Sequence, residues 1–359
     1  MLRDYLRLMV GLPPGDEVDE NDEDDLGFVR QYDLTAVDWS DCWERIYVDE
    51  TDKAKLVNYG LLEQQLQAAD LDGMTLSRHG AVLLSGPPGT GKTTLAKGAA
   101  NELRRRLDPE ELGVEDVVFK QIEVRHLFSS DHGDSPKLVE SAFDAVIDDA
   151  EGGDVYQVVL LDEVESLFAN RGDLGDTDPM DAIRAVNTAL DSLDTLAESD
   201  NVYVISTSNQ PGAVDSAYVD RTDEQIYVGN PVPRHRREIL LDIFEHLGET
   251  FGAEVSPTAS ELDRLVELSS GFSGRRMRKS VLSALARNEA TVADPAALSP
   301  GHLVEEFAHK KSMLEDADND YVRLGDTPDR PSYATDAADA TRGADGSRER
   351  PDAPSARED

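Results

Sequence analysis

The sequence predicts an α/β fold, with a parallel sheet of five strands joined by crossover helices and then a small domain made only of helices. Two observations predict it. Up to about residue 230, short runs rich in β-branched residues alternate with stretches of helical periodicity, which is typical of strand–helix–strand units. From Pro233 onward these runs stop and helical periods follow one another. A chain of 359 residues is long enough for two domains with their own cores.

The first part of the chain, residues 1–40, is expected to be an acidic and largely disordered segment. Positions 16–25 read DEVDENDEDD, and such a run stays solvated because it has almost no apolar surface to bury. Ahead of it, five apolar residues at helical spacing predict one short amphipathic helix, which we expect to pack on its own domain rather than on a partner: Leu2, Tyr5, Leu6, Met9 and Val10.

The α/β domain is expected to cover residues 41–230 and the helical domain residues 231–316. The strands are predicted at 81–85, 117–124, 155–162, 201–207 and 224–229. The helical periods fall at about 233–247, 258–269, 275–290 and 299–315. Residues 317–359 have few large apolar side chains and are expected to be a disordered acidic tail.

The composition limits where the protein works and what it binds. The net charge is −39, from 74 acidic and 35 basic residues, of which nine are lysine. An acidic, lysine-poor surface suits molar salt, where the Debye length is about 3 Å, so a salt-loving archaeal host is favoured over an acidic mesophile. The same charge disfavours a broad grip on nucleic acid. Cys42 is the single cysteine, and no stretch approaches the roughly 18 apolar residues of a membrane span. We therefore expect a cytoplasmic protein with no membrane partner.

The stretch SGPPGTGKTT, residues 85–94, carries the strongest chemical signal. It satisfies G-x-x-x-x-G-K-[ST], follows a predicted strand and opens a predicted helix. Its glycines let backbone N–H groups point inward around phosphate, and the helix N-terminus adds partial positive charge. Lys92 is expected to contact the β- and γ-phosphates, and the Thr93 hydroxyl to hold Mg²⁺. The predicted nucleotide-binding residues are Gly86, Pro87, Pro88, Gly89, Thr90, Gly91, Lys92, Thr93 and Thr94.

A second acidic motif ends the strand VVLLDE. Asp162 is expected to join Thr93 around Mg²⁺, and Glu163 to orient an attacking water, because ligands bind at the carboxyl ends of strands in such sheets. An Asp-Glu pair after an apolar run is weak evidence alone, but beside a phosphate loop it favours ATP hydrolysis over phosphoryl transfer to a metabolite. Asn209 follows the fourth strand at the same sheet edge and is expected to fix the water or sense the γ-phosphate rather than only cap a turn.

Two arginines are candidates for further contacts with the nucleotide. Arg221 precedes the fifth strand and is a candidate finger onto a neighbouring subunit's ATP, although its spacing fits a surface salt bridge equally well. Arg275, after GFSG in the helical domain, is expected to contact the nucleotide of its own chain. Ribose and adenine contacts are expected near Ile46 and Tyr47 and from the helical domain.

Together these motifs resemble an AAA+ ATPase, and within that superfamily the chain resembles the pachytene checkpoint protein family, also called thyroid hormone receptor interactor 13, which remodels HORMA-domain proteins. The resemblance runs from about Trp43 to about Phe307. It is closest in four stretches: LLDEVESLFANR (160–171), DAIRAVNTALDSLD (181–194), NVYVISTSN with VDSAYVDRTD (201–209 and 214–223), and GFSGRRMRK (271–279).

The resemblance implies a role for each matching residue. Lys92 and Thr93 would bind ATP and Mg²⁺, Asp162 and Glu163 would drive hydrolysis, and Asn209 would be sensor 1. Arg275 would be sensor 2. Arg221 would act across a subunit boundary, with Arg184 lining that boundary, in a ring expected to be hexameric.

The chain departs from the family's pattern in two places. The aligned first pore loop has Asp131 and His132 where relatives carry an aromatic residue that grips polypeptide, and the nearest aromatic, Phe128, is expected in the core. Forceful threading therefore does not transfer with the ATP site. In addition, only about 40 mostly acidic residues precede Trp43, where eukaryotic relatives have a folded substrate-recognition domain, so substrate docking is expected to use the tails or another protein.

The sequence thus predicts an ATPase ring that remodels a partner protein, with a HORMA-like protein as the first candidate. One rival is a DNA-acting loader, which uses the same ATP motifs but for which the acidic surface and the lack of an aromatic–basic strand motif are unfavourable. The other is a nucleotide-gated scaffold, favoured by the missing pore aromatic and disfavoured by Glu163.

Overall fold

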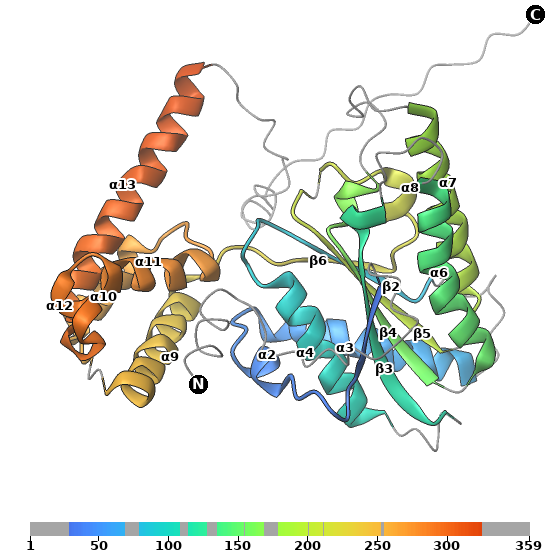
Figure 1. Cartoon of the computed structure of the whole chain (residues 1–359), viewed down its shortest axis with the longest axis horizontal. Helices are drawn as coiled ribbons and strands as arrows, with labels where there is room; N and C mark the ends of the chain where they lie inside the picture. Colours follow the sequence, from blue (N-terminus) through green and yellow to red (C-terminus); the bar gives the residue numbers. More distant parts are fainter. Residues whose placement is uncertain are drawn as a thin grey trace, which may run out of the picture. The chain divides into compact units, whose positions relative to one another are not determined.

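The computed structural model describes residues 29–68, 79–107, 114–127, 135–153, 155–168, 179–199, 201–210, 212–252 and 255–324 (Figure 1). Apart from the end of the last helix, the architecture below belongs to the compact unit that ends at Leu314. The expected N-terminal helix, the acidic run 16–25, the pore-loop residues Asp131 and His132, and the tail beyond Leu324 lie outside the described residues.

A six-stranded, mostly parallel sheet forms the centre of the α/β part. Its strand order is β1-β3-β4-β5-β2-β6. All neighbours are parallel except β1, which pairs with β3 in the antiparallel direction. The strands are β1 (Val29–Asp33), β2 (Ala81–Ser85), β3 (Asp116–Glu123), β4 (Val155–Asp162), β5 (Val202–Ser208) and β6 (Glu224–Tyr227).

The expectation of five parallel strands was therefore wrong by one strand. The additional strand, β1, lies inside the segment 1–40 that we expected to be largely disordered. It reads VRQYD, and of these residues only Tyr32 is fully buried. An edge strand held by backbone pairing to one neighbour needs no run of β-branched residues, so the sequence carries no strong signal for it.

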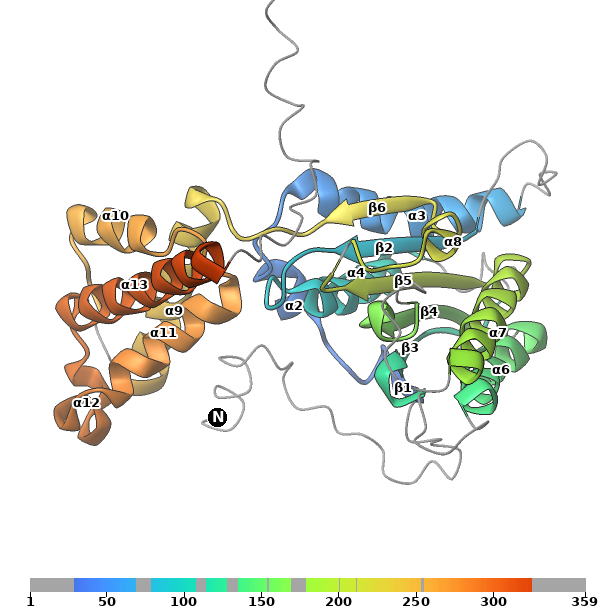
Figure 2. The same cartoon turned by 90° about the horizontal axis from the view of Figure 1, so that it is seen from above.

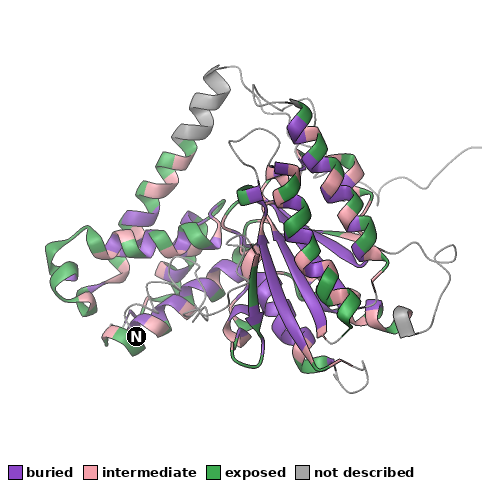
Figure 3. Ribbon diagram, turned by 45° about the vertical axis from the view of Figure 1, so that its right-hand side comes forward, coloured by how far each residue is buried: buried purple, intermediate pink, exposed green. Residues whose placement is uncertain are grey.

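Two layers of helices cover the sheet (Figure 2). One core packs against α2 (Ser40–Glu44), α3 (Glu50–Ala68) and α4 (Lys92–Arg106), and the other against α6 (Ser135–Gly152) and α7 (Pro179–Ala197). Side chains alternate between the two: Val82 and Leu84 join the first core, Ala81 and Leu83 the second. Because both faces are buried, the central strands are mostly apolar, and most of their residues are drawn as buried in Figure 3.

Short helices connect the strands at the edge where β2, β3, β4 and β5 end. They are the 3-10 helix η1 (Val124–Leu127) after β3, the 3-10 helix η2 (Val164–Ser166) after β4, and α8 (Ser216–Val219) between β5 and β6. Strand register brings Glu123 of β3 opposite Asp162 of β4, and Ser85 of β2 opposite Ser208 of β5. The residues that follow these strands therefore meet at one edge.

The helical part has a core of its own. Pro233 occupies the first turn of its first helix, and Thr258 and Glu261 form a reciprocal capping box at the second. Phe272 and Phe307 stack in its interior with ring centroids 6.0 Å apart. The helices are α9 (Pro233–Phe251), α10 (Ala259–Leu268), α11 (Gly274–Ala286), α12 (Glu289–Ala293) and α13 (Pro300–Leu324), with a 3-10 turn η3 (Pro295–Ala297).

The last helix runs past the expected end of the helical domain. α13 continues to Leu324, whereas we expected a disordered tail from residue 317. Among the helices of the described residues, none is both long enough and apolar enough to cross a bilayer.

Candidate functional site

The glycine-rich loop lies between β2 and α4. Gly86, Gly89 and Gly91 have φ of 147°, 79° and 100°, a region that side chains disfavour. A Cβ at Gly86 would also stand 2.2 Å from the carbonyl oxygen of Val228, so the close approach of two backbones requires glycine there. The N-cap Gly91 offers no side-chain acceptor to the first turn of α4. The N–H groups of that turn can therefore serve an anion.

Lys92 is buried beneath this loop, with 5% of its surface exposed. Its Nζ donates to the carbonyl oxygens of Gly86 (2.8 Å) and Pro87 (3.0 Å) and to Asn209 Oδ1 (2.8 Å). Burial lowers the pKa of Lys92 to about 8, against the opposing charges of Glu165 and Asp162. A cation thus lies next to open N–H donors, and this set of groups fits a phosphate chain.

The other residues of the glycine-rich loop surround this cradle, by which we mean the open N–H donors of the loop and the Lys92 ammonium group. Thr90 donates its hydroxyl to Pro87 O at 3.0 Å and is buried. Pro88 is exposed, and Thr94 is half-buried in the first turn of α4.

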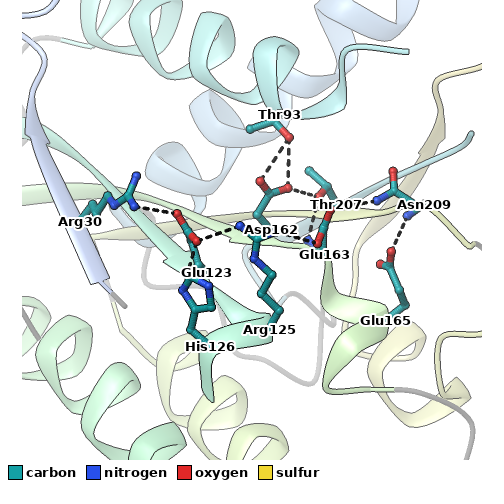
Figure 4. A network of polar contacts seen from close by, with 10 residues as sticks. All are labelled: Arg30, Thr93, Glu123, Arg125, His126, Asp162, Glu163, Glu165, Thr207 and Asn209. Carbon is teal, nitrogen blue, oxygen red and sulfur yellow. Dashed lines mark hydrogen bonds and ion pairs between the residues drawn. The ribbon is translucent and has the colours of Figure 1, made fainter. Parts of the chain in front are cut away.

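Thr93 and Asp162 meet across the site. Thr93 Oγ1 donates to Asp162 Oδ1 at 3.1 Å, and Thr207 Oγ1 donates to the same oxygen at 2.5 Å (Figure 4). Hydroxyl and carboxylate oxygens are the ligands that Mg²⁺ takes beside substrate phosphates. Among the described residues, no cluster of three or more His, Cys, Asp or Glu side chains suits a metal. The Thr93 hydroxyl and the Asp162 carboxylate thus fit a metal ion that is shared with phosphate.

Glu163 follows Asp162 in a strained backbone conformation. It is the only non-glycine residue of the described chain with positive φ, at 60°. Its N–H donates to Thr207 Oγ1 at 3.1 Å, and its Oε1 accepts from Asn209 Nδ2 at 3.3 Å. The structure therefore brings Lys92, Asp162, Glu163 and Asn209 together at one sheet edge, as the strand ends predicted.

Sequence reasoning missed several charged residues around this centre. Glu165 accepts from the Asn209 N–H at 3.0 Å. Arg125, on η1, lies with NH1 3.9 Å from Glu163 Oε2 and with NH2 3.3 Å from Glu123 Oε2. Glu123 in turn pairs with Arg30 of β1 at 3.1 Å, so the network in Figure 4 reaches the edge strand. The only signal in the sequence is that Glu123 and Glu165 are acids near the ends of strands.

Arg275 lies in the first turn of α11 and contacts the loop through its backbone. Its N–H donates to Gly89 O at 3.2 Å, while its side chain is exposed. A Cβ at Gly89 would stand 3.0 Å from Arg275 Cβ. On the other side of the loop, a Cβ at Gly91 would stand 2.2 Å from Ile46 Cδ1, and Tyr47 packs against the core of the helical part. Arg275 and Ile46 therefore contact the loop, whereas Tyr47 packs on the helical part.

Arg221 is engaged elsewhere. Its Nε and NH2 donate to the two carboxylate oxygens of Asp194 on α7, each at 2.7 Å, and its NH1 donates to Ala217 O at 2.9 Å. That pairing raises the pKa of Arg221 and lowers the pKa of Asp194. Within one subunit the arginine therefore forms the surface salt bridge that its spacing left open. Arg184 is exposed on the same helix, α7.

Known proteins share this architecture. The family model described as "ATPase family associated with various cellular activities (AAA)" matches residues 82–230. CD-NTase-associated protein 6 of Pseudomonas aeruginosa is 33% identical over 291 residues, which cover 80% of this chain and 93% of that protein. A pachytene checkpoint protein 2 homolog of Danio rerio is 35% identical over 227 residues, 63% of this chain. The chain spans 53% of the length of that relative.

Solved structures agree with this result. The structure of C. elegans PCH-2 matches with a TM-score of 0.65 and 26% identity over 80% of this chain and 76% of that one. One chain of an E. coli HORMA:CdnC:Trip13 complex matches with a TM-score of 0.62 over 78% of this chain and 93% of that one; at 17% identity it shows the fold alone.

The relatives named above come from a bacterium and from animals, and they give no support to the salt-loving archaeal host that the composition favoured. What the comparisons show is similarity of sequence over most of the chain and, for the C. elegans PCH-2 structure, similarity of fold. The chain therefore belongs to the AAA ATPase family and is homologous to CD-NTase-associated protein 6 and pachytene checkpoint protein 2.

Proposed function

We propose that this chain hydrolyses Mg·ATP as a hexameric ring in the cytoplasm and uses the energy to remodel a partner protein. The observation that carries the proposal is the meeting of a buried lysine, two strand-end acids and an amide: Lys92 bonds Asn209, and Asn209 bonds Glu163. Asp162 lies beside them and accepts a hydrogen bond from the Thr93 hydroxyl. A cation for phosphate, oxygen ligands for Mg²⁺ and a carboxylate for water are the parts that ATP hydrolysis needs.

Each residue has a separate role in this proposal. The backbone N–H groups of residues 89–94 and the Lys92 ammonium bind the phosphates, and Thr93 and Asp162 hold Mg²⁺. When bound, Mg·ATP supplies the phosphoanhydride bond and a divalent charge. Glu163 orients the attacking water through the carboxylate that Asn209 holds at 3.3 Å. Arg275 lies beside the loop and completes the binding of the nucleotide from the helical part.

The ring is proposed from Arg221. Its ion pair with Asp194 is partly exposed, with 26% and 50% of the two side chains accessible. Such pairs contribute about 0–1 kcal/mol, so a phosphate on a neighbouring subunit can replace Asp194 at little cost. Arg221 then acts as the finger for that neighbour, and Arg184 lies at the same boundary.

The partner is proposed to be a HORMA-domain protein. The resemblance in residues 160–171, 181–194 and 271–279 is to a family that remodels such proteins, and one structure with this fold is a HORMA:CdnC:Trip13 complex. Asp131 and His132 in the aligned pore loop favour a milder rearrangement of the partner over forceful threading.

The test is a Glu163→Gln variant of the full chain. We expect it to keep ATP binding and to lose turnover by about 10²- to 10⁴-fold, because the amide cannot accept the proton of water. With ATP bound it should retain the partner, which mass spectrometry of co-purified proteins identifies. The net charge of −39 leads us to propose that the ring works in concentrated salt, so binding is tested in molar KCl and at about 0.15 M.

The matched control is Glu151→Gln, which changes an exposed glutamate at the end of α6. It should turn over ATP at the wild-type rate. Equal turnover by wild type and Glu163→Gln would contradict hydrolysis through Glu163 and favour the nucleotide-gated scaffold. Recovery of DNA without a protein partner would contradict protein remodelling.

A further inference from the structure

Glu165 occupies a place that the proposed hydrolysis does not use. The left-handed backbone of Glu163 starts the short η2 helix, and this turn brings residue 165 next to the end of β5. There Glu165 Oε1 accepts the backbone N–H of Asn209 at 3.0 Å (Figure 4). Its second oxygen, Oε2, is buried and has no hydrogen-bond partner among the described residues.

The N–H of Asn209 needs such a partner because the ladder of the sheet has ended. The last paired residue of β5 is Ser208, opposite Ser85. Beyond it, Asn209 is half-buried, and a backbone donor there is costly to leave unpaired. Glu165 supplies the acceptor, and a charged acceptor makes the stronger type of hydrogen bond. The backbone at Asn209 is thereby tied to the turn that carries Glu163.

The side chain of Asn209 makes two contacts with the site. Its Oδ1 accepts from Lys92 Nζ at 2.8 Å, and its Nδ2 donates to Glu163 Oε1 at 3.3 Å. An amide bonded on both sides orients both groups only if its own backbone is fixed. Of the two anchors of that backbone, one is the strand β5 and the other is Glu165.

The charge of Glu165 fits the same arrangement. A buried carboxylate oxygen without a hydrogen-bond donor is costly unless an opposite charge is near. Lys92 Nζ donates to Asn209 Oδ1 and Glu165 Oε1 accepts from the Asn209 N–H, so Asn209 lies between the ammonium group and this carboxylate.

We propose that Glu165 is a positioning residue for ATP hydrolysis, which fixes the backbone of Asn209 so that its amide holds Glu163 and Lys92 in one arrangement. Glu165 acts on the reaction through Asn209 and does not itself bind the nucleotide. This inference rests on the proposed hydrolysis by Glu163.

The test is a double-mutant cycle in the full chain with Glu165→Ala, Asn209→Ala and the double variant. Loss of a hydrogen bond to a charged group predicts a fall in kcat of about 10- to 100-fold for Glu165→Ala. The Kd of a non-hydrolysable ATP analogue should change by no more than about threefold, because the cradle and Lys92 remain. In the Asn209→Ala background, the further loss from Glu165→Ala should be less than about threefold, because the residue it positions is gone.

Two more variants separate positioning from a general structural role. Glu165→Gln keeps an acceptor for the Asn209 N–H and should retain kcat within about fivefold. Glu151→Ala, on the exposed end of α6, should leave kcat unchanged. If Glu165→Ala melts more than about 10 °C below wild type, Glu165→Asp takes its place in the cycle, because its shorter side chain withdraws the oxygen but keeps the charge.

The outcomes for Glu165 are distinct from those for the proposed function. A wild-type chain without ATPase activity would overturn the proposed hydrolysis itself. An active wild type with additive losses in the cycle, with wild-type kcat in Glu165→Ala, or with a loss in analogue affinity as large as the loss in kcat would overturn the role of Glu165 alone.

Discussion

Lys92 illustrates how one side chain couples binding to pH. In the free protein its ammonium is buried among carbonyl and amide oxygens, and burial lowers its pKa to about 8 from 10.5. Between these two values the unfolded chain binds more protons at this position than the folded chain. The contribution of Lys92 to the free energy of unfolding therefore rises with pH from about 8 to 10.5 and is unfavourable below that window.

The same titration predicts a pH dependence for the reaction. kcat/KM for ATP should fall as pH rises through about 8, because the free protein then loses the cation that binds phosphate. kcat should persist to higher pH, because bound phosphate charge favours the protonated lysine. Steady-state rates between pH 6 and 10 measure both. In Lys92→Arg the guanidinium stays charged, so the decrease in kcat/KM above about pH 8 should disappear even if the variant is slower at every pH. If the decrease persists, another group causes it.

At the scale of single residues, the sequence predicted which side chains meet at the sheet edge and missed the contacts that orient them. Lys92, Thr93, Asp162, Glu163 and Asn209 were found because motif spacing and strand ends place them at one edge. Glu165 was missed because its role depends on the left-handed turn at Glu163, which no residue pattern announces. The partner of Arg221 in its own subunit, Asp194, is 27 residues away along the chain and has no spacing rule.

At the scale of elements, α2 and α4 pack so closely at Gly98 that a side chain there would clash with the backbone of α2. A Cβ on Gly98 of α4 would lie 2.9 Å from the backbone N and Cα of Trp43 in α2. The chain then continues from α2 to Ile46, which meets the phosphate loop at Gly91. Gly98 therefore sets the distance between a helix that starts at the cradle and the segment that lines its other side.

This contact predicts a stability difference between two glycine substitutions. Gly98→Ala should lower the free energy of unfolding, because overpacking against a backbone costs about 1–3 kcal/mol and exceeds the roughly 1 kcal/mol gain in helix propensity. Gly152→Ala, near the end of α6, meets nothing within 4 Å and should be neutral or slightly stabilising. Denaturant unfolding measures both. Equal midpoints for the two variants would show that α2 moves away from α4 at no cost.

The elements were predicted unequally, for a physical reason. β2 and β4 were predicted at their observed bounds, because strands buried on both faces are nearly continuous apolar runs. β1 was missed because an edge strand with one buried side chain can be polar at its other positions. The observed end of α13 lies beyond the predicted one, because few large apolar residues predict disorder from residue 317, whereas an exposed helix can continue without them.

At the scale of the whole molecule, one subunit holds a nucleotide site and, separately, an arginine paired to its own surface. If the ring completes the site, turnover per subunit should rise with protein concentration as subunits assemble. Arg221→Ala should assemble yet turn over ATP about 10³-fold more slowly, because an arginine finger contributes at least about that factor to kcat in phosphoryl transfer. Steady-state ATPase assays and sedimentation across a concentration series measure the two quantities.

A suitable control is Arg237→Ala, which removes another arginine from a surface ion pair, with Asp263 in the helical part. It should leave both turnover and assembly unchanged. Full activity in Arg221→Ala rings, or turnover independent of protein concentration in the wild type, would contradict the role of Arg221 as a finger. Its ion pair with Asp194 would then be its only role.

The hydrogen bond from Arg275 N–H to Gly89 O has a mechanical consequence. Both the donor and the acceptor are backbone groups, so a change of side-chain rotamer cannot lengthen this bond. If the helices that follow residue 233 swing by more than about an ångström, they must either sever this link or drag residue 89 along. Release of the hydrolysed nucleotide and movement of the helical part would then be one and the same conformational change.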